Sequence, residues 1–356
     1  MTVDIQVYTL NGAAGAPVHA AGRLSIVAMS ARAFWVEEPG RGAIRDVELP
    51  APGAADVVVR TLCSGISRGT ESLVFRGGVP ASQYDTMRAP FQEGSFPGPV
   101  KYGYLSVGGV ESGPPALVGR IVFCLYPHQT RYVVPADAVT VVPDGVPPRR
   151  AVLAGTVETA VNALWDGAPL LGDRVAVVGS GMVGACVARL LVRFGGLSVT
   201  VVDSNDARAD LAAALGATFA RPEDAPRDLD LVFHASASAA GLQLSLDLLA
   251  PDATVVDLSW YGDAPVTVSL GEAFHQRRLT IRASQVGAVA PARRGSRTTK
   301  DRLALALDLL QDNAFDTLLT GSSPFSELPA TMARIPTMTD VLCHTIDYDE
   351  PPRAGE

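Results

Sequence analysis

Residues 175–184, Val-Ala-Val-Val-Gly-Ser-Gly-Met-Val-Gly, decide the fold of this chain. An apolar strand runs directly into the spacing Gly-x-Gly-x-x-Gly, which then opens an apolar helix. In that arrangement Gly179 makes a tight turn, Gly181 lets the backbone approach a pyrophosphate, and Gly184 lets helix and strand pack closely. The helix N-terminus offers free N–H groups and the positive end of a dipole to phosphates. The stretch therefore predicts a dinucleotide-binding strand–helix–strand unit.

Strand and helix patterns alternate around this unit. Apolar, β-branched runs predict strands at 174–178, 198–202, 229–233, 253–258 and 279–281. Helical spacing predicts helices at 183–194, 207–215 and 239–249. Such alternation is typical of a buried parallel sheet with helices on its faces. We therefore expect an α/β fold with a Rossmann doubly wound parallel sheet over residues 155–291.

The flanking regions have different patterns. Short Val- and Ile-rich runs bounded by Gly and Pro predict strands at 56–62, 117–123 and 131–134, so residues 29–154 are expected to form a β-rich domain of barrel-like connectivity. Residues 292–356 turn polar, then predict an amphipathic helix at 302–310 and short strands. Residues 1–28 are Ala- and Gly-rich and weakly patterned, which favours a loose tail over an extra strand at 4–10.

An acidic residue follows the second predicted strand of the nucleotide unit. Asp203 lies 19 residues after Gly184 (203 − 184), where a carboxylate accepts hydrogen bonds from ribose hydroxyls and repels a 2′-phosphate. This position favours NAD over NADP. Further side chains or backbone groups at the carboxyl ends of these strands and at the helix start are expected to contact the cofactor: Ser180, Met182, Val183, Ser204, His234 and Ala235.

Composition narrows the classes of function. The chain has 356 residues, 47% of them hydrophobic and 19% charged, with a net charge of −8, which argues against nucleic acid or an anionic membrane as the main partner. Its four cysteines lie far apart and include no Cys-x-x-Cys pair, so we expect neither a disulfide framework nor a cysteine zinc lobe. No signal peptide pattern precedes the fold, and a reducing cytoplasm is the expected compartment.

The order of these parts and three motifs resemble the medium-chain dehydrogenase/reductase superfamily, zinc-type alcohol dehydrogenase branch. The likeness covers roughly residues 30–346. It implies a GroES-like catalytic domain and a Rossmann domain with the active site in the cleft between them, and a C-terminal segment that completes the catalytic domain. It also implies a homodimer that pairs sheet edges at 279–286 and a threonine, Thr159, packed beside the nicotinamide.

The zinc positions depart from the family pattern. Where zinc-containing members have CGICGTD, this chain has Ser-Gly-Ile-Ser-Arg-Gly-Thr-Glu at 64–71, with Ser67 in the ligand position. The GHEFVG segment reads Gly-Tyr-Leu-Ser-Val-Gly, so that Tyr104 replaces the ligand histidine, and the remaining ligand falls at about Gly155. A neutral hydroxyl is a poor zinc donor, and residues 124–131 lack the four-cysteine structural lobe. We therefore expect no metal.

A zinc-free dehydrogenase still needs groups that stabilise an alkoxide and move a proton. Tyr104 is the first candidate, with Lys101 three residues before it as a cation expected to lower the phenol pKa. Ser67 and Thr70 are candidates for a hydroxyl relay, although such residues often only form turns. His128 and Glu158 are the remaining candidates, and each has a structural alternative: a buried histidine and a carboxylate stabilised by a helix dipole.

Two features bear on the substrate. Trp260 and Tyr261 end a predicted strand at the ligand edge of the sheet, which favours a ring-bearing substrate or a rim over the nicotinamide. A basic run at 277–278 and 293–300 could bind an anion or form a solvated surface. The sequence favours an NAD-dependent interconversion of a secondary alcohol and a ketone. A zinc-free NAD(P)H-dependent enoyl or quinone reductase and a non-catalytic nucleotide-binding scaffold remain alternatives.

Overall fold

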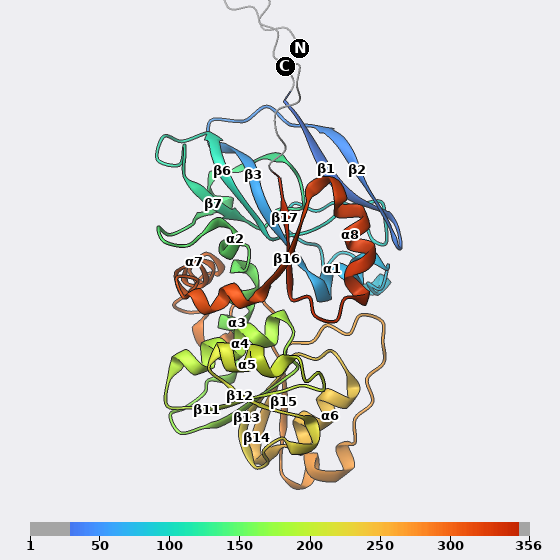
Figure 1. Cartoon of the computed structure of the whole chain (residues 1–356), viewed down its shortest axis with the longest axis vertical. Coiled ribbons are helices and arrows are strands. Elements are labelled where there is room, and N and C mark those ends of the chain that lie inside the picture. The colour runs from blue at the N-terminus through green and yellow to red at the C-terminus, as the bar shows by residue number, and fades with distance from the viewer. Residues whose placement is uncertain (1–28, 349–356) are drawn as a thin grey trace, which may run out of the picture.

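The computed structural model describes residues 29–348, so the expectations for the first 28 residues lie outside the described part. The chain forms two lobes, with the first lobe at the top of Figure 1 and the parallel sheet at the bottom. Among residues 29–348, no helix is long and apolar enough to cross a bilayer.

The first lobe consists of two sheets. A four-stranded sheet has the order β2-β1-β5-β4, and a seven-stranded sheet has the order β16-β17-β3-β6-β7-β9 with β8 paired to β3. The strands from the first part of the chain are β1 Ser30–Glu38, β2 Arg41–Glu48, β3 Asp56–Ser67, β4 Glu93–Gly94, β5 Val100–Lys101, β6 Ser106–Ser112, β7 Ile121–Cys124, β8 Arg131–Pro135 and β9 Val139–Val141. Pairs within these sheets are antiparallel except β16 with β17.

The end of the chain returns to this lobe. Strand β17, Cys343–Asp347, pairs with β3, and β16, Leu319–Pro324, pairs with β17. In Figure 1 these last strands run beside the blue and teal strands of the first lobe. The register places Cys343 opposite Ser67 at the end of β3. The C-terminal strands therefore support the segment in which the family has a zinc ligand.

The second lobe is a six-stranded parallel sheet in the order β12-β11-β10-β13-β14-β15. Its strands are β10 Arg174–Val178, β11 Ser198–Val202, β12 Thr218–Ala220, β13 Leu229–His234, β14 Leu249–Asp257 and β15 Thr280–Ala283. The α-helices of the chain are α1 Arg68–Phe75, α2 Pro148–Ala151, α3 Ala154–Gly167, α4 Met182–Phe194, α5 Arg208–Leu215, α6 Ala239–Asp247, α7 Thr299–Leu309 and α8 Leu328–Arg334. The predicted α/β fold class is confirmed.

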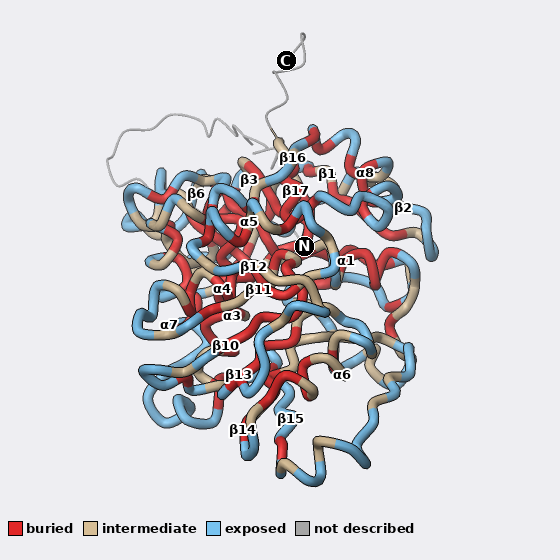
Figure 2. The backbone as a smooth tube through the Cα atoms, turned by 60° about the horizontal axis from the view of Figure 1, so that its bottom comes forward, coloured by how far each residue is buried: buried red, intermediate tan, exposed pale blue. Residues whose placement is uncertain are grey.

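The burial of its strands explains why the parallel sheet could be predicted from the sequence. Strands β10 and β13 are buried along almost their whole length, and they run as buried segments through the tube of Figure 2. Apolar side chains on both faces of a parallel strand pack against helices, so the strands read as continuous apolar runs. The two edge strands are exceptions, because all four residues of β15 are exposed and none of the three residues of β12 is buried.

Candidate active site

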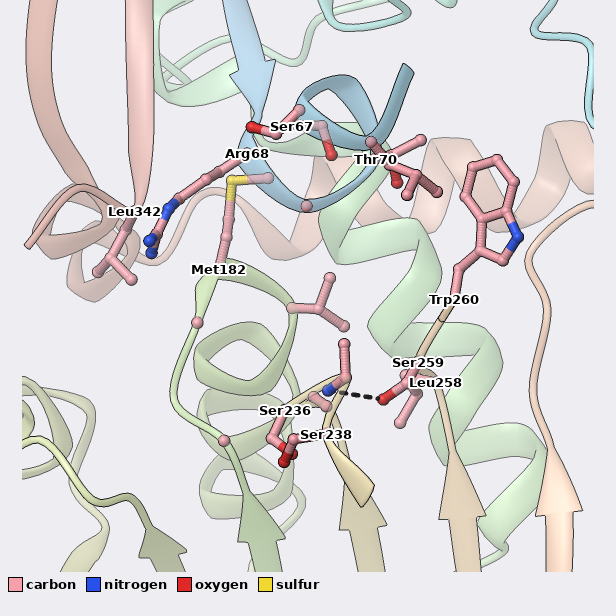
Figure 3. Close-up of a pocket in the computed structure, with 18 of the residues that line it drawn as sticks. Ser67, Arg68, Thr70, Met182, Ser236, Ser238, Leu258, Ser259, Trp260 and Leu342 are labelled. Carbon is pink, nitrogen blue, oxygen red and sulfur yellow. Dashed lines mark hydrogen bonds between the residues drawn. The ribbon is translucent and has the colours of Figure 1, made fainter. Parts of the chain in front are cut away.

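A cleft of about 730 Å³ lies between the two lobes, beside the Gly-x-Gly-x-x-Gly loop. Figure 3 shows Ser67, Arg68 and Thr70 on one side and Met182 at the start of α4 on the other. Trp260 stands at one end of this view, next to Ser259, whose hydroxyl accepts a hydrogen bond from the backbone N–H of Ala237. The cleft therefore joins the predicted nucleotide loop to the predicted catalytic segment.

The nucleotide loop has the geometry that its glycines predict. Gly179 has φ +98°, a conformation that residues with a side chain rarely adopt. A Cβ atom on Gly184 would lie 1.9 Å from the carbonyl oxygen of Gly179, so only glycine lets α4 start this close to the turn. A Cβ on Gly181 would have no atom within 4 Å, which leaves open space in front of the helix N-terminus. The loop fits the pyrophosphate of a dinucleotide.

Asp203 is fixed by the loop itself. Its Oδ2 accepts hydrogen bonds from the backbone N–H and the hydroxyl of Ser180, at 2.8 and 2.7 Å, and its Oδ1 accepts one from the N–H of Asn205 at 2.9 Å. Each carboxylate oxygen can accept about two hydrogen bonds, so Oδ1 retains an acceptor site. Asp203 also lines the cleft, where that site can accept a ribose hydroxyl.

Sequence reasoning overlooked two arginines in the cleft. Arg68 follows Ser67 directly, and Arg208 lies five residues after Asp203. Arg208 is buried, which lowers its pKa, and its guanidinium donates to the carbonyl oxygen of Thr339 at 2.7 Å. Arg208 is close to Asp203 in the sequence, but the direction in which its side chain points depends on where α5 begins. Both cations suit a ligand with two phosphates.

The hydroxyl groups of Ser67, Thr70 and Tyr104 meet at the first-lobe side. Ser67 and Thr70 line the cleft, whereas Tyr104 does not, and the hydroxyls of Ser67 and Thr70 act to lower the pKa of the Tyr104 phenol. Burial and the negative charge of Glu71 raise the pKa of Tyr104 to about 12. Tyr104 is therefore a protonated phenol at neutral pH, which can donate a hydrogen bond.

A buried pair lies behind these hydroxyls. The Glu71 carboxylate accepts hydrogen bonds from the Ser67 backbone N–H and from Nε2 of His128, both at 2.8 Å. The side chains of Glu71 and His128 are 3% and 1% exposed, so this pair is shielded from water. The Nδ1 of His128 meets the Ser64 hydroxyl at 2.7 Å, and that hydroxyl meets Tyr348 at 2.9 Å. His128 thus acts on the site through Glu71 and does not line the cleft.

The expected effect of Lys101 is wrong. The Lys101 ammonium donates to Gln129 at 2.8 Å, to the hydroxyl of Tyr126 and to the carboxylate of Glu93. The pKa of Tyr104 is raised, not lowered, because burial and then the negative charge of Glu71 disfavour the phenolate. In the extended segment at β5 the Lys101 side chain faces a different cluster, and its own pKa is lowered by burial.

The side chains of Glu158 and Thr159 on α3 make other contacts and do not line the cleft. Arg302 on α7 donates to Glu158 at 3.0 Å, and both side chains are almost completely buried. Burial raises the pKa of Glu158, and Arg302 opposes that shift. The Thr159 hydroxyl donates to the carbonyl oxygen of Gly155 in its own helix. Neither residue lines the cleft, so the contact of Thr159 with a nicotinamide remains a prediction.

At the strand ends of the parallel sheet, only some of the residues expected from the sequence line the cleft. The His234 ring is fully buried, with Nδ1 at 2.9 Å from Asp257 and Nε2 at 2.7 Å from Ser236. The Tyr261 hydroxyl donates to Asp257 at 3.1 Å. Neither ring lines the cleft, whereas several neighbours do: Ala235, Ser236, Ser238, Ser259 and Trp260. The other predicted cofactor residues that line it are Gly179, Gly181, Met182, Val183, Asp203 and Ser204.

The former zinc position is filled by packing. A Cβ on Gly155 would lie 2.7 Å from the Leu105 side chain, so these two family positions are in apolar contact. Ser67 and Tyr104 offer neutral hydroxyls, which are poor zinc donors. Within residues 29–348, no group of three or more His, Cys, Asp or Glu side chains could hold a metal ion. The residues present do not fit the zinc site of the family.

Comparisons with known proteins agree with this architecture. Residues 182–308 match the family model described as zinc-binding dehydrogenase. A Rhodobacter capsulatus protein, 2-desacetyl-2-hydroxyethyl bacteriochlorophyllide A dehydrogenase, is 29% identical over 256 residues, which are 66% of this chain and 75% of that protein. Starvation-sensing protein RspB of Escherichia coli K12 is 28% identical over 218 residues, 53% of this chain, and the match spans only 62% of that relative.

Solved structures share the fold. A short chain alcohol dehydrogenase from Escherichia coli CFT073, complexed with NADH, has a TM-score of 0.72 at 18% identity and covers 90% of this chain and 99% of that one. A putative zinc-binding dehydrogenase from Sinorhizobium meliloti, bound to NADP, has a TM-score of 0.72 at 18% identity, with coverage of 90% and 100%.

The fold and the family match define the class that the chain resembles, the NAD(P)-dependent oxidoreductases of the medium-chain dehydrogenase/reductase superfamily. The likeness is to its zinc-type alcohol dehydrogenase-like branch, and the sequence motifs predict Ser67, Tyr104 and about Gly155 at the zinc-ligand positions. The resemblance predicted from the sequence is confirmed.

Proposed function

We propose that the protein interconverts a secondary alcohol and its ketone with NAD(H), without zinc. The observation that carries the proposal is the hydroxyl cluster of Ser67, Thr70 and Tyr104, which stands at the catalytic segment of the cleft where zinc relatives bind the metal. A protonated phenol can donate to a carbonyl oxygen as negative charge develops on it. Reduced nicotinamide supplies the hydride when it is bound.

The residues of the chain bind the substrate oxygen, donate the proton and hold the donor in position. In ketone reduction, Ser67 and Thr70 contact the substrate oxygen, and Tyr104 supplies the proton directly or through one of these hydroxyls. Glu71 keeps the phenol protonated, since a nearby negative charge disfavours the phenolate. His128 fixes the carboxylate of Glu71 by its Nε2 hydrogen bond and is therefore a positioning residue.

A relative supports the substrate class. The Rhodobacter capsulatus relative is named as a dehydrogenase of a bacteriochlorophyllide that carries a hydroxyethyl group. A hydroxyethyl substituent on a flat macrocycle agrees with an alcohol substrate that bears a ring. In this chain the indole of Trp260 at the end of the cleft offers a flat apolar surface for such a ring.

NAD is the cofactor that Asp203 favours. Its free acceptor site suits a ribose hydroxyl, and its charge disfavours a 2′-phosphate. Arg208 weighs in the other direction because a guanidinium beside the same ribose position can pair with that phosphate. We propose that Asp203 prevails, because its carboxylate is locked in place by Ser180 and Asn205 whereas Arg208 already donates to Thr339.

The test is turnover by metal-free protein. Protein dialysed against chelator is assayed for NADH oxidation with a set of aryl methyl ketones, with flat enones and quinones, and with aldehydes. Ketone reduction at unchanged rate after dialysis, together with oxidation of the matching secondary alcohols by NAD, is the expected result. Turnover of enones or quinones alone would assign the reductase alternative. A lack of turnover with every acceptor, despite NADH binding, would leave the scaffold alternative.

We also propose a homodimer through the edge of the parallel sheet. Strand β15 is fully exposed, and its Ile281 side chain is among the exposed large apolar residues. An unpaired apolar edge would invite aggregation unless another copy covers it. Light scattering should give twice the chain mass, and Ile281→Lys should give the mass of one chain. A wild-type monomer at micromolar concentration would contradict the proposal.

A further inference from the structure

A second concavity, of about 490 Å³, lies apart from the nucleotide cleft and shares no residue with it. It is bounded by the C-terminal halves of α3, α4 and α7 and by the turns after α3 and before α7. We call it the helix groove. Its main apolar walls are Leu164, Trp165, Leu190, Phe194, Leu305 and Leu309.

Exposed apolar side chains are concentrated in and beside the helix groove. Residues 29–348 expose nine large hydrophobic side chains, and four of them are in the groove or beside it. Leu170 is 70% exposed, Phe194 53% and Leu305 37%, and all three line the groove, while Leu171 is next to it in the chain. Single exposed apolar residues are ordinary, but a concave cluster of them marks a binding surface.

Two guanidinium groups stand in the lining of the groove. Arg193 lies in the last turn of α4, where it offsets the negative end of the helix dipole, and its guanidinium is 3.1 Å from Asp312. Arg293 is exposed, and its guanidinium makes neither a hydrogen bond nor an ion pair with the residues that the structure describes, although its backbone is hydrogen-bonded. Arg293 belongs to the basic run at 293–300, although the whole chain carries a net charge of −8.

We propose that the helix groove binds an amphipathic monoanion, of the class of long-chain carboxylates, with its apolar chain along the leucines and its headgroup at Arg293. The volume lies in the usual range of small-molecule sites, roughly 300–1,000 Å³. Arg193 already has an ion-pair partner in Asp312, which it shares with Arg189, whereas the structure gives the Arg293 guanidinium no such partner among the described residues. Arg293 is therefore the cation that we assign to the ligand headgroup. This binding does not depend on the redox reaction proposed above.

Charge and shape distinguish this occupant from two others. A second copy docked by a two-fold axis would bring the same patch of both chains together, and with it two copies of Arg193 and Arg293 in one apolar interface. A bilayer would meet a concave surface on an acidic protein, whereas membrane-bound proteins present convex apolar segments and clustered cations. A single acyl chain fits the concavity without either cost.

The probe is dodecanoate, titrated into the full chain by calorimetry below its micellar concentration. We expect saturable binding of one dodecanoate per chain and a change in tryptophan fluorescence, because Trp165 lines the groove. Leu305→Glu places a like charge on the wall at an exposed position, and it should weaken binding about tenfold or more. The matched control is Leu270→Glu, at another exposed leucine outside the groove, which should bind like the wild type.

The headgroup is tested separately. Arg293→Gln should weaken dodecanoate binding several-fold and leave the binding of neutral dodecanol unchanged, and dodecyltrimethylammonium should not bind. Failure of dodecanoate to bind, equal affinity for the cationic amphiphile, or unchanged affinity in Leu305→Glu would overturn the proposal. Conversion of an oligomer to a smaller species by Leu305→Glu would assign the groove to a second copy, and binding to anionic vesicles but not to free dodecanoate would assign it to a lipid surface.

Discussion

Replacement of Tyr104 by phenylalanine separates the proposed chemistry from the fold. The substitution removes one hydroxyl and keeps the ring, which packs against two separate clusters of buried apolar residues. The hydrogen bonds that are lost lead to Ser67 and Thr70, which line the cleft and can bond to water instead. The free energy of unfolding should therefore fall by only about 1 kcal/mol.

The effect on turnover should be much larger. Removal of one donor to a developing oxyanion costs roughly 10²–10³ in kcat, or about 3–4 kcal/mol of transition-state stabilisation. Since the pKa of Tyr104 is about 12, the phenol and not the phenolate is lost at neutral pH, so the loss should be the same from pH 6 to pH 9. Steady-state ketone reduction gives kcat, and NADH fluorescence titration should give an unchanged cofactor affinity.

The matched control is Tyr102→Phe. Tyr102 is a buried neighbour whose ring meets that of Tyr104 edge to face at 6.1 Å. Neither phenol lines the cleft, but the Ser67 and Thr70 hydroxyls act on Tyr104 and not on Tyr102. Its variant should keep near-wild-type turnover. If Tyr104→Phe retains more than about a third of the wild-type rate, the donor role is refuted, since such a loss is far below that of an oxyanion donor.

Three further outcomes follow from the same geometry. Asp203→Ser should weaken NADH binding, because Ser180 loses its hydrogen-bond acceptor. In paired fluorescence titrations, the variant should also show a smaller preference for NADH over NADPH. A preference of the wild-type protein for NADPH would contradict this assignment. Gly184→Ala places a Cβ 1.9 Å from the Gly179 carbonyl oxygen, and this overpacking should cost about 1–3 kcal/mol and lower the melting temperature. The clash should also shift α4 enough to abolish NADH binding. A normal NADH affinity would show that the loop can move to accommodate the methyl group. Tyr104 ionises near pH 10 when unfolded and near 12 when folded, so between these values the unfolded chain binds fewer protons and stability falls by about 3 kcal/mol as pH rises. Denaturant titrations of wild type and Tyr104→Phe at pH 9 and 11.5 check this, and equal losses in both would argue against it.

The sequence predicted the parallel sheet most closely. Strands 174–178 and 198–202 match β10 and β11 residue for residue, because a strand buried on both faces is a continuous apolar run with clear ends. Strand β12, Thr218–Ala220, was missed because its three residues carry no period that distinguishes a strand from a loop. The strand predicted at 117–123 is displaced by a few residues from β7, because the apolar residues Leu117 and Val118 lie in a turn before the strand.

The site was predicted less completely than the fold. The loop glycines and Asp203 form a local pattern, and most of them do line the cleft. The pair of Glu71 and His128 joins residues 57 positions apart, from α1 and the segment before β8, and no local spacing in the sequence indicates that contact. Lys101 failed for the opposite reason: a separation of three residues suggested a contact with Tyr104 that the extended backbone of β5 does not make.

The pairing of β17 with β3 sets the order in which a nascent chain can mature. The strand that ends in Ser67 is synthesised well before its partner Cys343–Asp347. The parallel sheet is complete once β15 has been synthesised, so it can fold during translation while β3 still has an open edge. Until β17 is synthesised, that open edge is free to pair with other chains, and a message truncated before residue 343 would yield a nucleotide-binding lobe beside an incomplete first sheet.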